Sequence, residues 1–263
     1  MRLSDIVRAQ ASHLPGDPPP QDRAEPSHVL PVQDPITGVP SSSDQTAACA
    51  DWYDLAQKEM ARVGTFVQAK RAVPLDQCHT LAADVVKRLS ASDGLIRCMM
   101  HGDTHDYQSA NAVHVAILSV KIGLGLHYDS AALEPSALAG LLHDLGMWLL
   151  PQDIVEKQDL LNEEERARIH AHPEEGRRII ADMGEAHEWL ATAIAQEHER
   201  WDGSGYPCRL KGKDIAESAQ IIGLADVIDA LISPRPYHAR LVPHQALRAL
   251  LVQHKEAFPP RLL

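Results

Sequence analysis

The sequence predicts an all-α protein, a bundle of packed helices, on the basis of three observations. Apolar residues recur at intervals of three and four in several segments, which is the period of one helix face. Asn162 is followed three residues later by Glu165, a pattern typical of a helix N-terminus in which both side chains cap backbone N–H groups. Residues 221–232 are almost entirely apolar, as in a helix that is buried on all sides.

The N-terminal segment has a different composition from the rest of the chain. Residues 1–48 contain most of the proline-rich sequence, including Pro18-Pro19-Pro20, and a run of serines at 41–43. Such a composition cannot bury enough apolar area to offset the entropy of ordering. We therefore predict that residues 1–48 form a disordered Pro/Ser-rich segment.

Residues 49–104 are predicted to form a small N-terminal helical extension. Two apolar stripes support this prediction. One runs from Leu75 to Leu89 after Pro74, and the other, earlier in the sequence, consists of Trp52, Leu55, Ala56, Met60 and Val63. Amphipathic stripes usually form core, so we interpret this segment as a helical cap or a dimerising element. A ligand-sensing site is the alternative.

Helices are also predicted throughout residues 105–263. One apolar stripe comprises Val113, Ala116, Ile117, Val120 and Leu124. A helix over Ser136–Leu150 should end before Pro151, which cannot continue it. Further helices are expected from Asn162 to Gly184, from Glu185 to His198 and over Ile221–Ile232.

Composition restricts the class of partner. The formal net charge of −11 argues against duplex nucleic acid, whose phosphate backbone is bound by clustered Lys and Arg. A small anionic ligand in a metal-lined pocket remains compatible, because bound cations would dominate the local field. The four cysteines have no C-x-x-C spacing and are interpreted as reduced thiols, and no run of about 18 apolar residues occurs. We expect a cytoplasmic protein without a membrane span.

Histidine and aspartate residues form a pattern that suggests metal binding. His143 and Asp144 are adjacent, and His172, His198 and Asp226 follow on separate predicted helices that a bundle could bring together. A buried carboxylate such as Asp226 costs several kcal/mol unless it is paired or bound to a metal. Mixed imidazole and carboxylate ligands suit iron or manganese, whereas the lack of thiolate ligands weakens a structural zinc interpretation.

Four ordered motifs resemble those of the HD-GYP family, HD-superfamily phosphohydrolases that hydrolyse cyclic di-GMP. The motifs are Leu141–Gly146, Ile169–Gly176, His198–Pro207, and Leu224–Leu231 followed by Arg235-Pro236-Tyr237. The resemblance covers roughly residues 106–258 and implies an HD-domain helical bundle over residues 105–263. It also implies hydrolysis of cyclic di-GMP to the linear dinucleotide or GMP, with two divalent metal ions. Iron or manganese is expected, with zinc, magnesium or nickel as alternatives.

The resemblance assigns roles to individual residues. The expected metal ligands are His143, Asp144, His172, Glu197, His198 and Asp226, and Asp144 and Glu197 are also the expected catalytic residues. The expected substrate-binding residues are Gly205, Tyr206, Pro207, Lys211 and Arg235. Hydrolysis of a phosphodiester needs water with a lowered pKa and neutralised phosphoryl oxygens, and two metals about 3.5–4 Å apart supply both.

The sequence departs from the family pattern at three positions. Asn111 stands where the family usually has a metal-binding histidine, Glu197 replaces the first of two adjacent histidines, and Met147 replaces a lysine. Glu197 is still a competent ligand for a hard cation. Asn111 is a weak ligand, and His114 lies on a neighbouring helix face and could partly substitute for it. Met147 removes a cation that would otherwise meet phosphate.

These departures leave two functional hypotheses from different classes. The first is an active cyclic di-GMP phosphodiesterase. The second is a weakly active or inactive receptor that binds cyclic di-GMP or a signalling-protein partner. Hydrolysis of another phosphoester is a third alternative, because fold does not determine substrate. A homodimer is compatible with either hypothesis.

Overall fold

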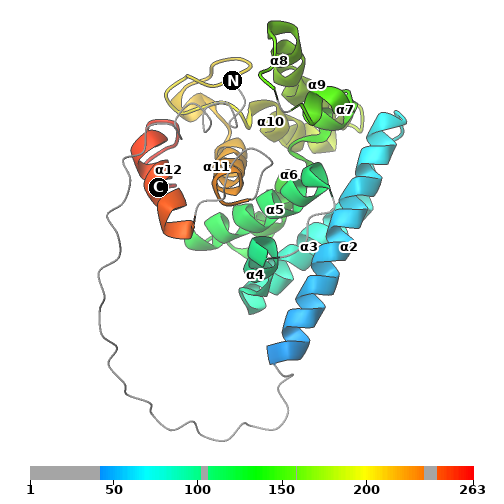
Figure 1. Ribbon diagram of the computed structural model, residues 1–263, viewed down its shortest axis with the longest axis vertical. Coiled ribbons are helices and arrows are strands. Elements are labelled where there is room, and N and C mark those ends of the chain that lie inside the picture. Colours follow the sequence, from blue (N-terminus) through cyan, green and yellow to red (C-terminus); the bar gives the residue numbers. More distant parts are fainter. Residues whose placement is uncertain (1–41, 102–105, 158, 234–241) are drawn as a thin grey trace, which may run out of the picture.

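The computed structural model describes residues 42–101, 106–157, 159–233 and 242–263, and all regular elements within these ranges are helices (Figure 1). The prediction of an all-α bundle is confirmed. The α-helices are α2 (Ser42–Gln68), α3 (Leu75–Ala91), α4 (Gly94–His101), α5 (Tyr107–Gly125), α6 (Ser130–Leu142), α7 (Gln152–Val155), α8 (Glu163–His170), α9 (His172–Ala181), α10 (Glu188–Gln196), α11 (Glu217–Ile232) and α12 (Pro243–Gln253). Short 3-10 helices are η2 (Leu145–Leu149), η3 (Glu185–His187) and η4 (Gly212–Asp214).

Helix α5 lies at the centre of the bundle, in contact with α2, α3, α6 and α11. The side chain of Asp106 caps its N-terminus by accepting hydrogen bonds from the backbone N–H groups of Gln108 and Ser109. Most of α5 is buried, including its polar residues Asn111 and His114. A central helix that is buried on nearly every face must place its polar side chains against other polar groups. The partners of Asn111 and His114 therefore show where polar groups meet inside the bundle.

The N-terminal helices share the core of the rest of the bundle. In Figure 1, α2 runs along one edge of the molecule, and it contacts α4 and α5. One continuous apolar cluster extends from Cys49 on α2 to Phe258 near the C-terminus. Helix α2 begins at Ser42, so it includes residues 42–48, which were expected to be disordered. The remainder of that expected segment lies outside the described residues.

Three predicted helices end or divide at positions that differ from expectation. Helix α6 ends at Leu142 instead of Leu150, and residues 145–149 form η2. The helix predicted from Asn162 to Gly184 divides at Ala171, after which Pro173 occupies the first turn of α9. Proline has no N–H to continue the preceding helix but is tolerated in a first turn. The predicted capping of Asn162 with Glu165 is confirmed.

The third difference concerns the helix expected over Glu185–His198. Helix α10 ends at Gln196, so Glu197 and His198 lie just beyond its last turn, and η3 precedes it. Candidate ligands thus lie at or just beyond these helix ends.

The contact between α5 and α6 is so close that it requires glycine at position 140. A Cβ atom added to Gly140 would lie 2.6 Å from the Cα of Ala116 and 2.7 Å from its backbone nitrogen. Backbone atoms cannot move aside as a flexible side chain can. The Cβ of alanine at position 140 would therefore push α5 and α6 apart.

We expect Gly140→Ala to destabilise the protein by about 1 to 3 kcal/mol, the range for overpacked cores. Gly125→Ala is the matched control, since a Cβ at Gly125 would meet nothing within 4 Å. That control should be neutral or stabilising by up to about 1 kcal/mol, because alanine favours helix. Urea unfolding measures both. Equal stability of the two variants would contradict the close packing of α5 on α6.

Candidate metal centre

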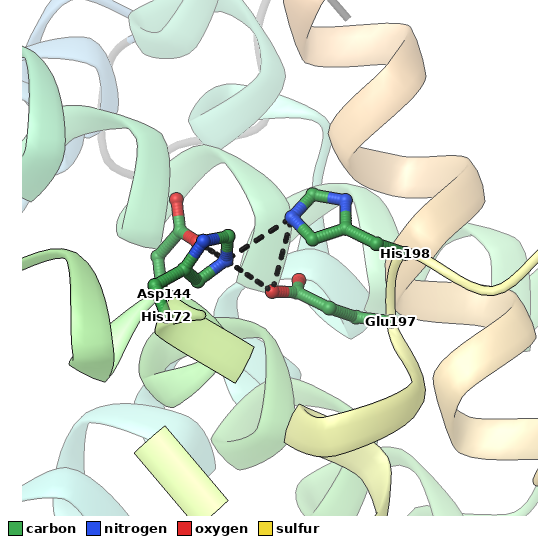
Figure 2. Close-up of side chains that lie close together, drawn as sticks. All are labelled: Asp144, His172, Glu197 and His198. Carbon is green, nitrogen blue, oxygen red and sulfur yellow. Dashed lines mark hydrogen bonds and ion pairs between the residues drawn. The ribbon is translucent and has the colours of Figure 1, made fainter. Parts of the chain in front are cut away.

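Four candidate ligands converge at the ends of three helices (Figure 2). Asp144 follows α6, His172 is the first residue of α9, and Glu197 and His198 follow α10. One ligand atom from each of these four residues lies within 4.8 Å of the others. The sequence motifs placed these four residues on three separate helices, and the structure brings them together.

The backbone orients two histidines toward this cluster. His143 Nδ1 donates a hydrogen bond to the carbonyl oxygen of Gly140 at 2.8 Å, and His172 Nδ1 donates to that of Ile169 at 2.6 Å. Because a carbonyl oxygen only accepts, Nδ1 carries the proton in each neutral ring, and Nε2 is left with its lone pair. This arrangement, with the other ring N–H donated to a carbonyl, is typical of metal-bound histidine.

The Nε2 atoms of His143 and His172 face carboxylates. His143 Nε2 is 3.5 Å from Asp144 Oδ2 and 3.9 Å from Glu197 Oε2. His172 Nε2 is 3.0 Å from Asp144 Oδ1 and 3.2 Å from Glu197 Oε1. Both carboxylates therefore lie between the two imidazoles, where either could bridge cations.

His198 completes the cluster from the opposite side. Its Nε2 atom lies 3.1 Å from Nε2 of His172 and 3.5 Å from Glu197 Oε1. Two imidazole nitrogens at this distance repel each other through their lone pairs unless a proton or a cation lies close to both. A shared or neighbouring metal ion satisfies this requirement for both rings.

Buried polar atoms without hydrogen-bond partners support a cation. Among the described residues, His143 Nε2 and Glu197 Oε2 are buried and have no hydrogen-bond partner. His143 and Glu197 are both 0% exposed. An unsatisfied buried carboxylate oxygen is costly, and a metal ion would offset that cost. The donor set of imidazole nitrogens and carboxylate oxygens therefore fits a divalent cation.

The pKa values reflect the same crowding of charge. Burial lowers the pKa of His143, but Asp144 and Glu197 outweigh it and raise that pKa to about 9. For His172 the same competition gives a pKa of about 10. Burial raises the pKa of Glu197 to about 7 against the opposing effect of the histidines, and burial together with His172 lowers the pKa of His198. Burial opposes ionisation of Asp144, yet His143 and His172 hold its pKa well below the usual range.

Asp226 and Asn111 border the cluster. Asn111 Nδ2 donates hydrogen bonds to Asp226 Oδ1 at 3.3 Å and to Asp229 Oδ2 at 2.8 Å. The carboxylate of Asp226 also contributes to raising the pKa of His143, which places its charge near the cluster. Asp226 does not belong to the group of four clustered residues, so its role as a further ligand stays a prediction.

The structure does not support His114 as a substitute ligand. Its Nε2 contacts the hydroxyl of Tyr53 at 2.6 Å, and its Nδ1 contacts Asp229 Oδ1 at 2.7 Å. Both ring nitrogens are therefore engaged by protein groups away from the four clustered ligands. The spacing of His114 from Asn111 along the helix could not reveal these contacts, because Tyr53 is 61 residues from His114 in the sequence.

The glycine-containing loop after His198 is held against the cluster. Glu199 is buried, and its carboxylate accepts hydrogen bonds from the backbone N–H groups of Cys208 at 2.6 Å and Leu210 at 2.9 Å. A Cβ on Gly205 would lie 2.4 Å from the backbone oxygen of His198, so only glycine fits there. No role was assigned to Glu199 from the sequence. Its position directly after two candidate ligands could have indicated a carboxylate that supports the site.

Tyr206 is stacked between two histidines. Its ring lies 4.6 Å from that of His198 and 4.1 Å from that of His170, with both pairs nearly parallel. The contact between His170 and Tyr206 could not be inferred from the sequence, which gave His170 no role. The structure also contains a cis peptide bond between Tyr206 and Pro207.

A pocket of about 600 Å³ adjoins the cluster. Its lining includes His198 and Tyr206, together with the cationic residues Arg200 and Arg209 and the buried His254. Lys211, expected to bind substrate, is exposed and rests against Gly203 instead of lining this pocket. Arg235 lies outside the described residues.

Comparison with known proteins gives a consistent set of relatives. A family model described as an HD domain matches residues 81–262. Cyclic di-GMP phosphodiesterase PA4108 of Pseudomonas aeruginosa is 28% identical over 200 residues, which are 74% of this chain and 48% of that protein. The cyclic di-GMP phosphodiesterase response regulator RpfG of Xanthomonas campestris is 37% identical over 149 residues, or 56% of this chain and 39% of that protein.

Other comparisons extend this set. The 3′3′-cGAMP-specific phosphodiesterase 2 of Vibrio cholerae is 38% identical over 174 residues, covering 60% of this chain and 33% of that protein. The chain thus spans half or less of the length of these three relatives. A solved structure of Bd1817, an HD-GYP-type protein from Bdellovibrio bacteriovorus, aligns with a TM-score of 0.70 at 22% identity, covering 84% of this chain and 71% of that one. Among the described helices, none is long and apolar enough to cross a membrane.

The raised pKa values predict that metal binding releases protons. Below their pKa values of about 9 and 10, His143 and His172 are protonated without metal, and a cation must displace those protons. Metal affinity should therefore rise with pH between about pH 6 and 9, by up to roughly tenfold per pH unit for each displaced proton. Titration with Mn²⁺ in weakly buffered solution measures both affinity and released protons. An affinity independent of pH would contradict the assignment of these two rings as ligands.

Proposed function

We propose that this chain, which belongs to the HD domain family, is a metal-dependent phosphodiesterase that hydrolyses cyclic di-GMP. The observation that carries the proposal is the buried cluster of Asp144, His172, Glu197 and His198, with the unsatisfied Nε2 of His143 beside it. The names of the relatives support cyclic dinucleotides as the substrate class.

The proposed metal ligands are those expected from the sequence. His143, Asp144, His172, Glu197 and His198 would hold two cations, most favourably iron or manganese, and Asp226 would complete the set from α11. When bound, such metals lower the pKa of a coordinated water and neutralise charge on the phosphoryl oxygens. Asp144 and Glu197 flank His172 Nε2 and are the carboxylates best placed to bridge.

The remaining residues would position the substrate. Arg200 and Arg209 line the pocket beside His198, where a guanidinium could pair with a phosphate that is not being cleaved. Glu199 holds the loop in place through two backbone hydrogen bonds, and Tyr206 is fixed by its two histidine neighbours. The substrate would thus meet a site that is organised before it binds.

One observation favours a weakly active receptor as the second candidate. Met147, at the position where a family lysine would face phosphate, packs against the small apolar cluster of Ile154, Leu161 and Ile169. The site therefore lacks that cation. A receptor would keep the pocket and the metal but turn over slowly.

The test is incubation of purified protein with Mn²⁺ or Fe²⁺ and with cyclic di-GMP or 3′3′-cGAMP in parallel, followed by chromatography of the products. The proposal predicts linear dinucleotide or GMP from cyclic di-GMP. Preferential cleavage of 3′3′-cGAMP would change the substrate assignment. Tight binding of cyclic di-GMP without turnover in metal-loaded protein would instead support the receptor.

Asp144→Asn provides a sharper prediction. The amide keeps the shape of the side chain but removes the negative charge between His143 and His172. We expect metal content to fall and turnover to drop by about a hundredfold or more, since even partners of metal ligands are commonly worth 10–100-fold. Metal analysis and product assays on the same sample give both values. Full metal occupancy with wild-type turnover would refute the assignment of Asp144.

A further inference from the structure

We infer that helix α2 is a positioning element of the metal centre, acting through a buried hydrogen-bond chain that begins at Tyr53 and ends at Asp226. Helix α2 lies outside residues 81–262, the part of the chain that matches the HD domain model. The inference rests on the proposed function only for its kinetic consequence, because its main consequence concerns metal affinity.

The first link joins α2 to the central helix α5. Tyr53 is 3% exposed, and its hydroxyl lies 2.6 Å from Nε2 of His114. The two rings also stack, with centroids 5.8 Å apart. Since His114 Nδ1 faces a carboxylate, Nδ1 carries the ring proton and Nε2 accepts the hydrogen bond from the Tyr53 hydroxyl.

The second link joins α5 to α11. His114 Nδ1 donates to Asp229 Oδ1 at 2.7 Å, and the hydroxyl of Ser233 donates to the same oxygen. Asp229 is 0% exposed, and hydrogen bonds from His114, Ser233 and Asn111 stabilise its charge. A buried carboxylate that is fully hydrogen-bonded has little freedom to move.

The third link reaches Asp226, the candidate ligand on α11. Asn111 Nδ2 donates one hydrogen bond to Asp229 Oδ2 at 2.8 Å and another to Asp226 Oδ1 at 3.3 Å. Both of its amide protons are therefore directed to carboxylates, and a flipped amide would turn its oxygen against them. Asn111 thus fixes Asp226 by hydrogen bonding at the position where a histidine ligand was expected from the family pattern.

A second contact connects α2 to the other arm of the cluster. Gly64 on α2 faces the indole of Trp148 in η2, so closely that an added Cβ would lie 2.3 Å from its Nε1. The η2 segment directly follows Asp144, and Gly146 within it packs against the backbone oxygen of His172. Helix α2 therefore contacts η2, which directly follows Asp144, and also His114, the next member of the hydrogen-bond chain that leads to Asp226.

The test compares two variants that each remove one tyrosine hydroxyl. Tyr53→Phe breaks the first link while keeping the packing of the ring. Tyr128→Phe is the matched control, because the hydroxyl of Tyr128 donates to Glu217 at the first turn of α11, away from the clustered ligands. Mn²⁺ affinity is measured by the EPR signal of free Mn²⁺, and kcat and KM are measured on the same preparations.

We expect Tyr53→Phe to weaken Mn²⁺ binding by roughly three- to tenfold, the range for one lost buried hydrogen bond. Turnover should fall with KM nearly unchanged, since Tyr53 does not line the pocket. Tyr128→Phe should leave metal affinity within about twofold of wild type, even if both variants unfold at lower temperature. Unchanged Mn²⁺ affinity in folded Tyr53→Phe would overturn the inference.

Hydrogen exchange on the wild-type protein provides a second test that needs no variant. If α2 and the metal centre are coupled, metal binding must stabilise α2 in return. Backbone amides around Tyr53 and Gly64 should exchange more slowly after Mn²⁺ is added, and unchanged exchange would also overturn the inference. A wild-type protein that binds Mn²⁺ in this coupled manner but hydrolyses no cyclic dinucleotide would refute the proposed function alone.

Discussion

The burial of charge at the helix ends is the constraint on which the rest of the structure depends. His143, His172 and Glu197 are each exposed by no more than 2%, in a bundle whose surroundings are largely apolar. Ionisable groups in such a place cost several kcal/mol each unless they are paired, hydrogen-bonded or bound to a cation. The bundle offsets part of this cost by directing Nδ1 of both histidines at backbone carbonyls. A metal ion would provide a partner for the Nε2 atoms of these histidines and for the carboxylate oxygens beside them.

Helix positions were largely predictable from the sequence, whereas the helix ends were not. The stripe over Val113–Leu124 and the apolar run over Ile221–Ile232 lie within single helices, because burial on a helix follows directly from apolar spacing. Helix α6 instead ends at Leu142, and the residues after it pack closely on another part of the chain, as Gly146 does on the backbone of His172. Local apolar spacing does not record such a contact. Helix α2 similarly extends to Ser42, since a helix anchored by buried residues can propagate into a segment of weak preference.

The sequence predicted which candidate ligands lie close together, but not the contacts that support them. Adjacent His143 and Asp144, with His172 and His198 at later motifs, pointed to one centre, and the structure brings them together. Asn111 and His114 were considered as weak or substitute ligands, but they hydrogen-bond to carboxylates of α11. That network requires Tyr53, 61 residues from His114 in the sequence. Contacts between distant segments depend on tertiary packing, and for this reason the stack of His170 on Tyr206 was also missed.

The departures from the family pattern have different physical consequences. Glu197 exchanges an imidazole for a fully buried carboxylate, which adds negative charge to a cluster of histidines and favours a hard cation. Asn111 exchanges a ligand for a hydrogen-bond donor between Asp226 and Asp229. Met147 exchanges a cation for an apolar contact. The first change supports metal binding, the second ties the centre to α2, and the third reduces the positive charge available to a phosphate.

Anomalous diffraction from crystals grown with Mn²⁺ tests the central claim most directly. We predict anomalous peaks within bonding distance of Nε2 of His143 and His172 and of the carboxylates of Asp144 and Glu197. The Nδ1 atoms of both rings should keep their hydrogen bonds to Gly140 and Ile169. Crystals that bind Mn²⁺ elsewhere, or that leave this cluster without an anomalous peak at saturating Mn²⁺, would contradict the account.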